Sequence, residues 1–191
     1  MEFNWHPGIG DPTIGGWVTV VLYFLASVSC WKTAAIVRVR DRDVESDSYA
    51  WRAISISFFA LGINKQLDLQ TALTELGRVI AVEGGWYGQR QTVQVYFIIG
   101  IAIVCLMAAL TLVFWARRSP VLTWFGIAGS ISVLGYVLIR AASFHHIDRF
   151  IDSRILGFKW NWVLEMGGIV IVLLGSEWRR AKHHTQPVAS S

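Results

Sequence analysis

The chain has 191 residues, of which 54% are hydrophobic, and it carries a formal net charge of +4. The hydrophobic share exceeds the roughly 45–50% of ordinary soluble domains, and it is concentrated in long apolar blocks, which indicates a membrane protein. The basic charge does not indicate nucleic-acid binding, because the Lys and Arg residues cluster beside the apolar blocks, where membrane topology explains them. Cys30 and Cys105 both lie in apolar runs, which excludes a disulfide framework or a zinc ribbon.

Five apolar segments follow one another along the chain. They cover residues 16–37, 50–63, 93–115, 121–139 and 158–178. A helix needs roughly 20 residues to cross the hydrocarbon core of a bilayer, and only the second segment is clearly short of that length. The pattern predicts an all-α fold, in which residues 1–182 form a single integral membrane bundle of five transmembrane helices. Residues 183–191 are predicted to be a disordered cytoplasmic tail.

An odd number of spans places the two ends of the chain on opposite sides of the membrane. Basic clusters follow the first, third and fifth segments, and such clusters are typical of cytoplasmic loops. Tryptophans also mark both predicted interfaces, with Trp17 on one side and Trp31, Trp51 and Trp178 on the other. We therefore predict an N-terminus outside and a C-terminus in the cytoplasm. In a four-span alternative, the second segment lies on the membrane surface. We disfavour it because it would place the basic clusters after the first and third segments on opposite sides of the membrane.

The second segment becomes polar before it has crossed the membrane. Completing the crossing draws Asn64, Lys65 and Asp68 into the outer half of the bilayer, where each charge costs at least ~2.5–3.5 kcal/mol. Polar residues then recur at helical spacing as far as Arg78, which predicts an amphipathic helical extension after the second span. The alternative is an interfacial segment whose charges are simply solvated.

The fourth and fifth segments also place polar residues at this depth, in the outer half of the bilayer. Glu165 lies ~10 Å inside the outer end of the fifth segment, at 1.5 Å per residue, and Arg140 ends the fourth segment. Together with the second segment they predict a polar, charged pocket in the outer half of the bilayer. Its candidate binding residues are Asn64, Lys65, Asp68, Arg140, Ser143, Arg149, Asn161 and Glu165. The alternative is a polar clasp that fixes helix register and has no chemistry.

A histidine-rich stretch follows the fourth segment. If the helix continues, His145, Asp148 and Asp152 share a face, and imidazole with carboxylates suits a divalent metal. These three are the candidate metal ligands, and His145, His146 and Asp68 are the candidate catalytic residues. Arginines at 140, 149 and 154 compete for the same carboxylates, so hydrogen-bonded structural histidines are the simpler interpretation.

Small residues in the last two segments predict close packing between helices. They are Gly126, Gly129, Ser130, Gly167, Gly168 and Gly175. Small residues allow helix backbones in a membrane to approach one another. The pattern favours packing within one chain over a dimer face.

Three functions are compatible with these patterns. The first is a small polytopic membrane protein whose outer pocket binds a lipid headgroup, a small ligand or a partner subunit. The second is a membrane-embedded, metal-dependent hydrolase acting on a lipid-like substrate. The third is proton or ion translocation, which ranks last because the inner half offers no matching polar relay. We expect membrane lipid, a membrane protein or a second copy of the chain as partner, no nucleic acid, and a bacterial inner membrane as location.

Overall fold

The computed structural model describes residues 13–40, 45–67, 90–142, 154–155 and 158–185. Within these ranges the helices are α1 (Ile14–Arg40), α2 (Glu45–Leu67), α4 (Arg90–Ala116), α5 (Val121–Ala142) and α7 (Trp160–Thr185). Two short strands, β1 (Arg154–Ile155) and β2 (Phe158–Lys159), pair antiparallel just before α7. The helical fold predicted from the sequence is thus present throughout the described residues, apart from this small hairpin.

Each predicted segment forms a helix, and most helix ends lie a few residues beyond the apolar runs. The largest change is in α2, which begins at Glu45 and has acidic residues in its first turn, where the helix dipole favours negative charge. Its last turn contains Lys65, so the polar end of the second segment is helical. The amphipathic extension predicted after it lies outside the described residues. α7 continues to Thr185, which makes the first residues of the predicted tail helical.

Among the described helices, three are long and apolar enough to cross a membrane. These stretches are residues 14–38 of α1, 95–116 of α4 and 121–140 of α5. α2 and α7 have 23 and 26 residues, which at 1.5 Å per residue is also sufficient length. They differ from the other three in carrying several charged side chains. The apolar helices identify a membrane protein of the helical-bundle class.

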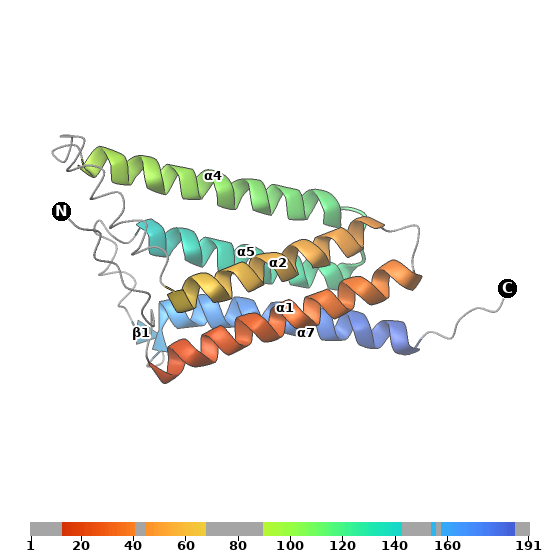
Figure 1. The fold of residues 1–191 in the computed structure, drawn as a ribbon. Coiled ribbons are helices and arrows are strands. Elements are labelled where there is room, and N and C mark those ends of the chain that lie inside the picture. Colours follow the sequence, from red (N-terminus) through yellow and green to blue (C-terminus); the bar gives the residue numbers. More distant parts are fainter. Residues whose placement is uncertain (1–12, 41–44, 68–89, 143–153, 156–157, 186–191) are drawn as a thin grey trace.

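The helices lie roughly along one common axis, and each described helix runs opposite to the one before it in the chain (Figure 1). α1 packs on α2 and α7, and α5 packs on α7, α2 and α4. The helices α1, α2, α5 and α7 therefore form a four-helix ring, with α2 and α7 on its diagonal and α4 on the outside. We call the end where α2 and α5 finish the outer end, and the end where α1, α4 and α7 finish the inner end, after the predicted orientation.

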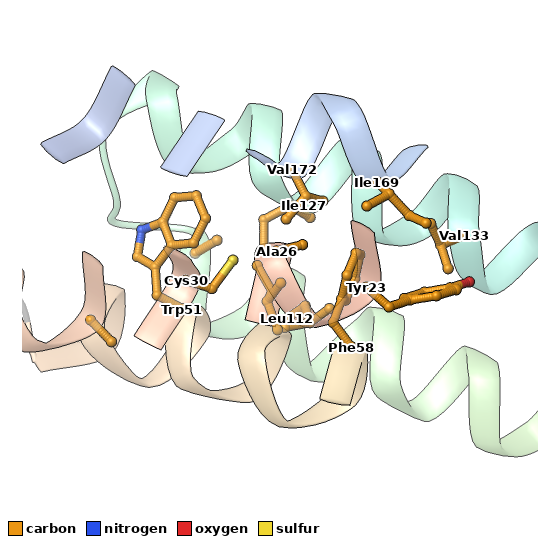
Figure 2. Packing of buried hydrophobic residues seen from close by; sticks show 13 residues of the cluster. Tyr23, Ala26, Cys30, Trp51, Phe58, Leu112, Ile127, Val133, Ile169 and Val172 are labelled. Carbon is orange, nitrogen blue, oxygen red and sulfur yellow. The ribbon is translucent and has the colours of Figure 1, made fainter. Parts of the chain in front are cut away.

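Apolar side chains fill the middle of the ring (Figure 2). They include Ile54 and Phe58 from α2, Ile127 from α5 and Val172 from α7, all fully buried. Trp51 is also fully buried, at 0% exposure, so its indole lies inside the bundle and not on the outer surface, where an aromatic belt would contact lipid headgroups. Gly126 on α5 explains the difference, because a Cβ there would lie 2.6 Å from the Trp51 ring. The missing side chain leaves room for the indole inside the bundle.

The glycines of α5 and α7 bring these two helices into backbone contact. A Cβ on Gly129 would lie 2.7 Å from the backbone oxygen of Gly168, and one on Gly168 would lie 3.0 Å from that of Gly129. A Cβ on Gly175 would lie 3.1 Å from the backbone nitrogen of Gly126. Close packing within the chain is confirmed at these positions. Gly167 differs, because a Cβ there would meet open space.

Candidate functional site

A buried carboxylate, Glu165 of α7, lies at the centre of a polar cluster at the outer end. It is 2% exposed. Its Oε2 accepts a hydrogen bond from Lys65 Nζ of α2 at 3.1 Å, and its Oε1 accepts one from the Tyr23 hydroxyl of α1 at 3.2 Å. Both carboxylate oxygens are thus engaged, and three helices meet at one side chain.

α5 is the fourth helix that contributes side chains to this cluster. The hydroxyl of Tyr136, a buried residue, lies beside both the Glu165 carboxylate and the Arg140 guanidinium. Tyr136 and Arg140 are one helical turn apart, so they share a face of α5. Arg140 itself is exposed in the last turn of α5. We call Tyr23, Lys65, Tyr136, Arg140 and Glu165 the outer cluster.

The outer cluster contains two cationic side chains and one carboxylate. The side chain of Lys65 is 15% exposed, and a long stem of this kind can lie along apolar surface while its ammonium reaches a polar group. Glu165 compensates the positive charge of Lys65. The close, hydrogen-bonded contact between them is what an ion pair away from water needs to be tolerated. Within the described residues the outer cluster therefore has a formal excess of one positive charge, and Arg140 is its accessible member.

The structure brings together three of the predicted binding residues, Lys65, Arg140 and Glu165. Asn64 lies next to Lys65 in the last turns of α2 and is partly buried. Asn161 lies in the first turn of α7, one turn from Glu165, but its side chain is outside the description. The remaining binding candidates, Asp68, Ser143 and Arg149, lie outside the described residues.

The candidate metal ligands and catalytic residues also lie outside the described residues. These are His145, His146, Asp148 and Asp152, together with Asp68. In the part of the chain that the structure describes, no group of three or more His, Cys, Asp or Glu residues could hold a metal ion. The predicted divalent metal site stays a prediction from the sequence.

Sequence reasoning missed both tyrosines of the outer cluster. Tyr23 and Tyr136 stand within long apolar runs, where they look like ordinary core aromatics. A buried tyrosine hydroxyl usually finds a hydrogen-bond partner. Their positions near the outer ends of two spans, at the expected depth of Glu165, were the available signal.

A second buried ion pair joins α2 and α7 at the inner end. Asp47 Oδ2 accepts hydrogen bonds from Arg179 Nη2 at 2.9 Å and from Nε at 3.3 Å. Asp47 Oδ1 accepts one from the Thr123 hydroxyl at 2.7 Å. Asp47 is 0% exposed, and Arg179 and Thr123 are buried with it.

Sequence reasoning did not anticipate this inner ion pair, since it expected no polar relay in the inner half to match the outer pocket. Asp47 looked like one charge among many in the first connector, and Arg179 looked like a member of a solvated basic cluster. Further polar contacts surround them: Ser29 bonds to Ser176 and to Glu177, both at 2.7 Å, and Glu177 pairs with Arg180. Between the inner polar groups and the outer cluster the core is largely apolar, with the buried hydrogen bonds of Ser27 and Ser55 as polar contacts between α1 and α2.

The charged residues of these two ion pairs occur in α2 as acid then base and in α7 also as acid then base, and each acid pairs with the base of the other helix. α2 carries Asp47 near its start and Lys65 near its end, whereas α7 carries Glu165 near its start and Arg179 near its end. The two helices run in opposite directions (Figure 1), so each charge faces its opposite. Along either helix the two charges are roughly 20–27 Å apart at 1.5 Å per residue. This spacing between the two ion pairs is comparable to the ~30 Å thickness of a hydrocarbon layer.

Comparison with known proteins gives no assignment, since no family model, curated protein or solved structure matches the chain. The geometry of the two charged clusters therefore supplies the functional argument.

Proposed function

We propose that this chain is a small polytopic membrane protein that binds an anionic group, above all a lipid headgroup phosphate, at the outer cluster. One observation carries the proposal. Among the described residues, Lys65 and Arg140 supply two positive charges around one buried carboxylate, Glu165, and Arg140 is exposed. An anion placed beside Arg140 would balance the excess charge.

The geometry assigns different roles to the charged residues. Glu165 has both oxygens engaged and holds Lys65 in place, so it orients the site rather than meeting the anion. The Arg140 guanidinium offers a planar fork of donors that matches the oxygens of a phosphate. Tyr136, one turn below, lies beside Arg140.

We further propose five membrane spans, with the N-terminus outside, in a bacterial inner membrane. All five described helices are long enough to cross, and they run alternately in opposite directions (Figure 1). Four charges of α2 and α7 are paired between the two helices inside the bundle, as Asp47–Arg179 and Lys65–Glu165, and Arg52 of α2 lies over the Trp31 ring of α1. The inner end also carries the basic residues Arg38, Arg117, Arg118, Arg180 and Lys182, as the positive-inside rule expects.

Native mass spectrometry of the protein released from its own membranes tests the binding function. We expect the parent protein to retain an anionic lipid, and Arg140→Gln to lose it. Arg117→Gln is the matched control, because Arg117 is an exposed arginine at the inner end, packed over the Phe114 ring. A parent protein without anionic lipid, or equal retention in both variants, would overturn the proposal.

The same spectra distinguish the alternatives. A stoichiometric metal that is lost in His145→Ala would favour the metal-dependent hydrolase. A retained second polypeptide would favour assembly with a partner subunit. Proton or ion translocation ranks lower, because among the described residues the core between the outer cluster and the inner ion pair is largely apolar, and Ser27 and Ser55 there bond to each other and to backbone carbonyls.

A further inference from the structure

An apolar groove opens between α2, α4 and α5. Its cavity volume is about 190 Å³. α2 lines it with Ile54, Phe58 and Leu61, α4 with Ala108 and Trp115, and α5 with Leu134. No charged side chain is among the residues that line it.

The groove exists because α4 packs on the ring mainly through its inner half. Leu112 and Ala116, near the inner end of α4, are buried. Toward the outer end, Val95, Ile99 and Ile103 are exposed, and α4 lies at the edge of the bundle (Figure 1). Small residues such as Ala108 keep the space between the helices open. The groove therefore faces the region that lipid chains occupy in a membrane.

The groove leads toward the cations of the outer cluster. Ile54, Phe58, Leu61 and Lys65 follow one another at intervals of four and three, so they form one stripe along α2. Lys65 lies one turn beyond Leu61 on this stripe. On α5, Arg140 lies roughly 9 Å beyond Leu134 along the axis at 1.5 Å per residue, on a face about 120° away. The apolar surface thus continues to Lys65 along α2, and Arg140 lies toward the same end of the groove.

We infer that the ligand of the outer cluster is a phospholipid, with its phosphate beside Arg140 and Lys65 and one acyl chain in the groove between α2, α4 and α5. This inference rests on the proposed function. A free phosphate would satisfy the cations but leave the groove to bulk lipid, whereas a phospholipid matches both surfaces at once. Apolar contact along the groove adds to the binding free energy in proportion to the area buried, and Trp115 lines the groove near its inner end.

Filling the groove tests this inference. Ala108→Trp places an indole in the space proposed for the acyl chain. Leu110→Trp is the matched control, because Leu110 is exposed on α4 and does not line the groove. In native mass spectra we expect phospholipid retention to fall about tenfold in Ala108→Trp, which corresponds to ~1.4 kcal/mol of binding free energy. Retention in Leu110→Trp should equal that of the parent protein.

A second measurement does not depend on the bulky substitution. The parent protein is placed in vesicles that contain a phosphatidylglycerol with a photoreactive group in one acyl chain. We expect crosslinks at Leu61, inside the groove, to fall in Arg140→Gln. Crosslinks at Ile56, which is exposed on α2, should not change, because bulk lipid reaches it in both proteins.

The outcomes separate the two proposals. If Arg140→Gln loses the lipid but Ala108→Trp retains it, and Leu61 labelling is independent of Arg140, the groove inference is wrong and the anion site stands. If Arg140→Gln retains the lipid, the proposed function fails, and the groove inference fails with it. Loss of lipid in both variants, with folding unchanged by circular dichroism, supports both proposals.

Discussion

At the scale of single residues, the notable feature is that four charged side chains in α2 and α7 are paired, three of them buried and Lys65 partly buried. Removing a charge from water costs several kcal/mol, and removing one partner of a buried pair costs more than the pair contributes, because the other charge is left uncompensated. The two pairs differ in burial: Asp47 and Arg179 are almost fully enclosed, whereas Lys65 retains some exposure. This difference sets the expected order of their mutational effects.

Glu165→Gln should destabilise the protein in detergent by ~1–3 kcal/mol, because Lys65 loses its counter-charge while the Tyr23 hydroxyl keeps an acceptor. Thermal unfolding measures the effect. Glu177→Gln is the control, because that side chain is 53% exposed and should matter little. If Glu165→Gln has parental stability and yet loses lipid, the carboxylate is a ligand-binding group and not a clasp.

Asp47→Asn should have the larger effect, about 3–5 kcal/mol, because it leaves Arg179 charged and enclosed. Glu45→Gln removes an exposed carboxylate from the same first turn of α2 and should be nearly neutral. Comparison of the unfolding midpoints in the same detergent is the measurement. Equal stability of the two variants would show that the Asp47–Arg179 pair is not formed in the membrane protein.

At the scale of elements, the contact between α5 and α7 depends on glycines rather than on apolar area. A membrane offers no hydrophobic driving force between helices, so close backbone approach and polar contacts have to supply the association energy. Gly129 and Gly168 meet backbone to backbone, which brings α5 close enough to α7 for Tyr136 to lie beside Glu165. The packing thus also positions the outer cluster.

Gly168→Ala should destabilise the bundle by ~1–3 kcal/mol, because its Cβ would lie 2.8 Å from Val133 Cγ2 and 3.0 Å from the Gly129 backbone oxygen. Gly167→Ala is a control on the neighbouring residue of the same helix, where a Cβ meets nothing within 4 Å. That variant should be neutral or gain up to ~1 kcal/mol from helix propensity. The same loss in both variants would show that contact between Gly168 and Gly129 does not control the stability of the bundle, since helix propensity alone favours Ala over Gly.

At the scale of the whole molecule, the four-helix ring explains how two polar helices can lie in a membrane. α2 and α7 occupy opposite corners, and each neutralises the charges of the other across the ring. α4 remains outside, exposes apolar side chains on most of its surface and needs no such partner. The ring makes the five-span topology physically reasonable, although α2 and α7 do not resemble transmembrane segments by composition.

Labelling of single cysteines in intact cells tests this topology. With Cys30 and Cys105 replaced by Ala, Thr13→Cys should react with a membrane-impermeant maleimide from outside. Arg38→Cys and Arg118→Cys should react only after permeabilisation, because both lie at the inner end. Reaction of Arg38→Cys and Arg118→Cys from opposite sides would instead support the four-span arrangement, with α2 on the surface.

The sequence by itself determined the five helices and the presence of membrane spans, because long apolar runs and helical periodicity are local properties. It also located Lys65, Arg140 and Glu165 at one depth, since depth follows from counting residues along each span. Only the tertiary structure decided which charges pair. Asp47 with Arg179, Tyr23 with Glu165, and Trp51 beside Gly126 join residues far apart in the chain. Such partners depend on the order of helices around the ring, which no local pattern encodes.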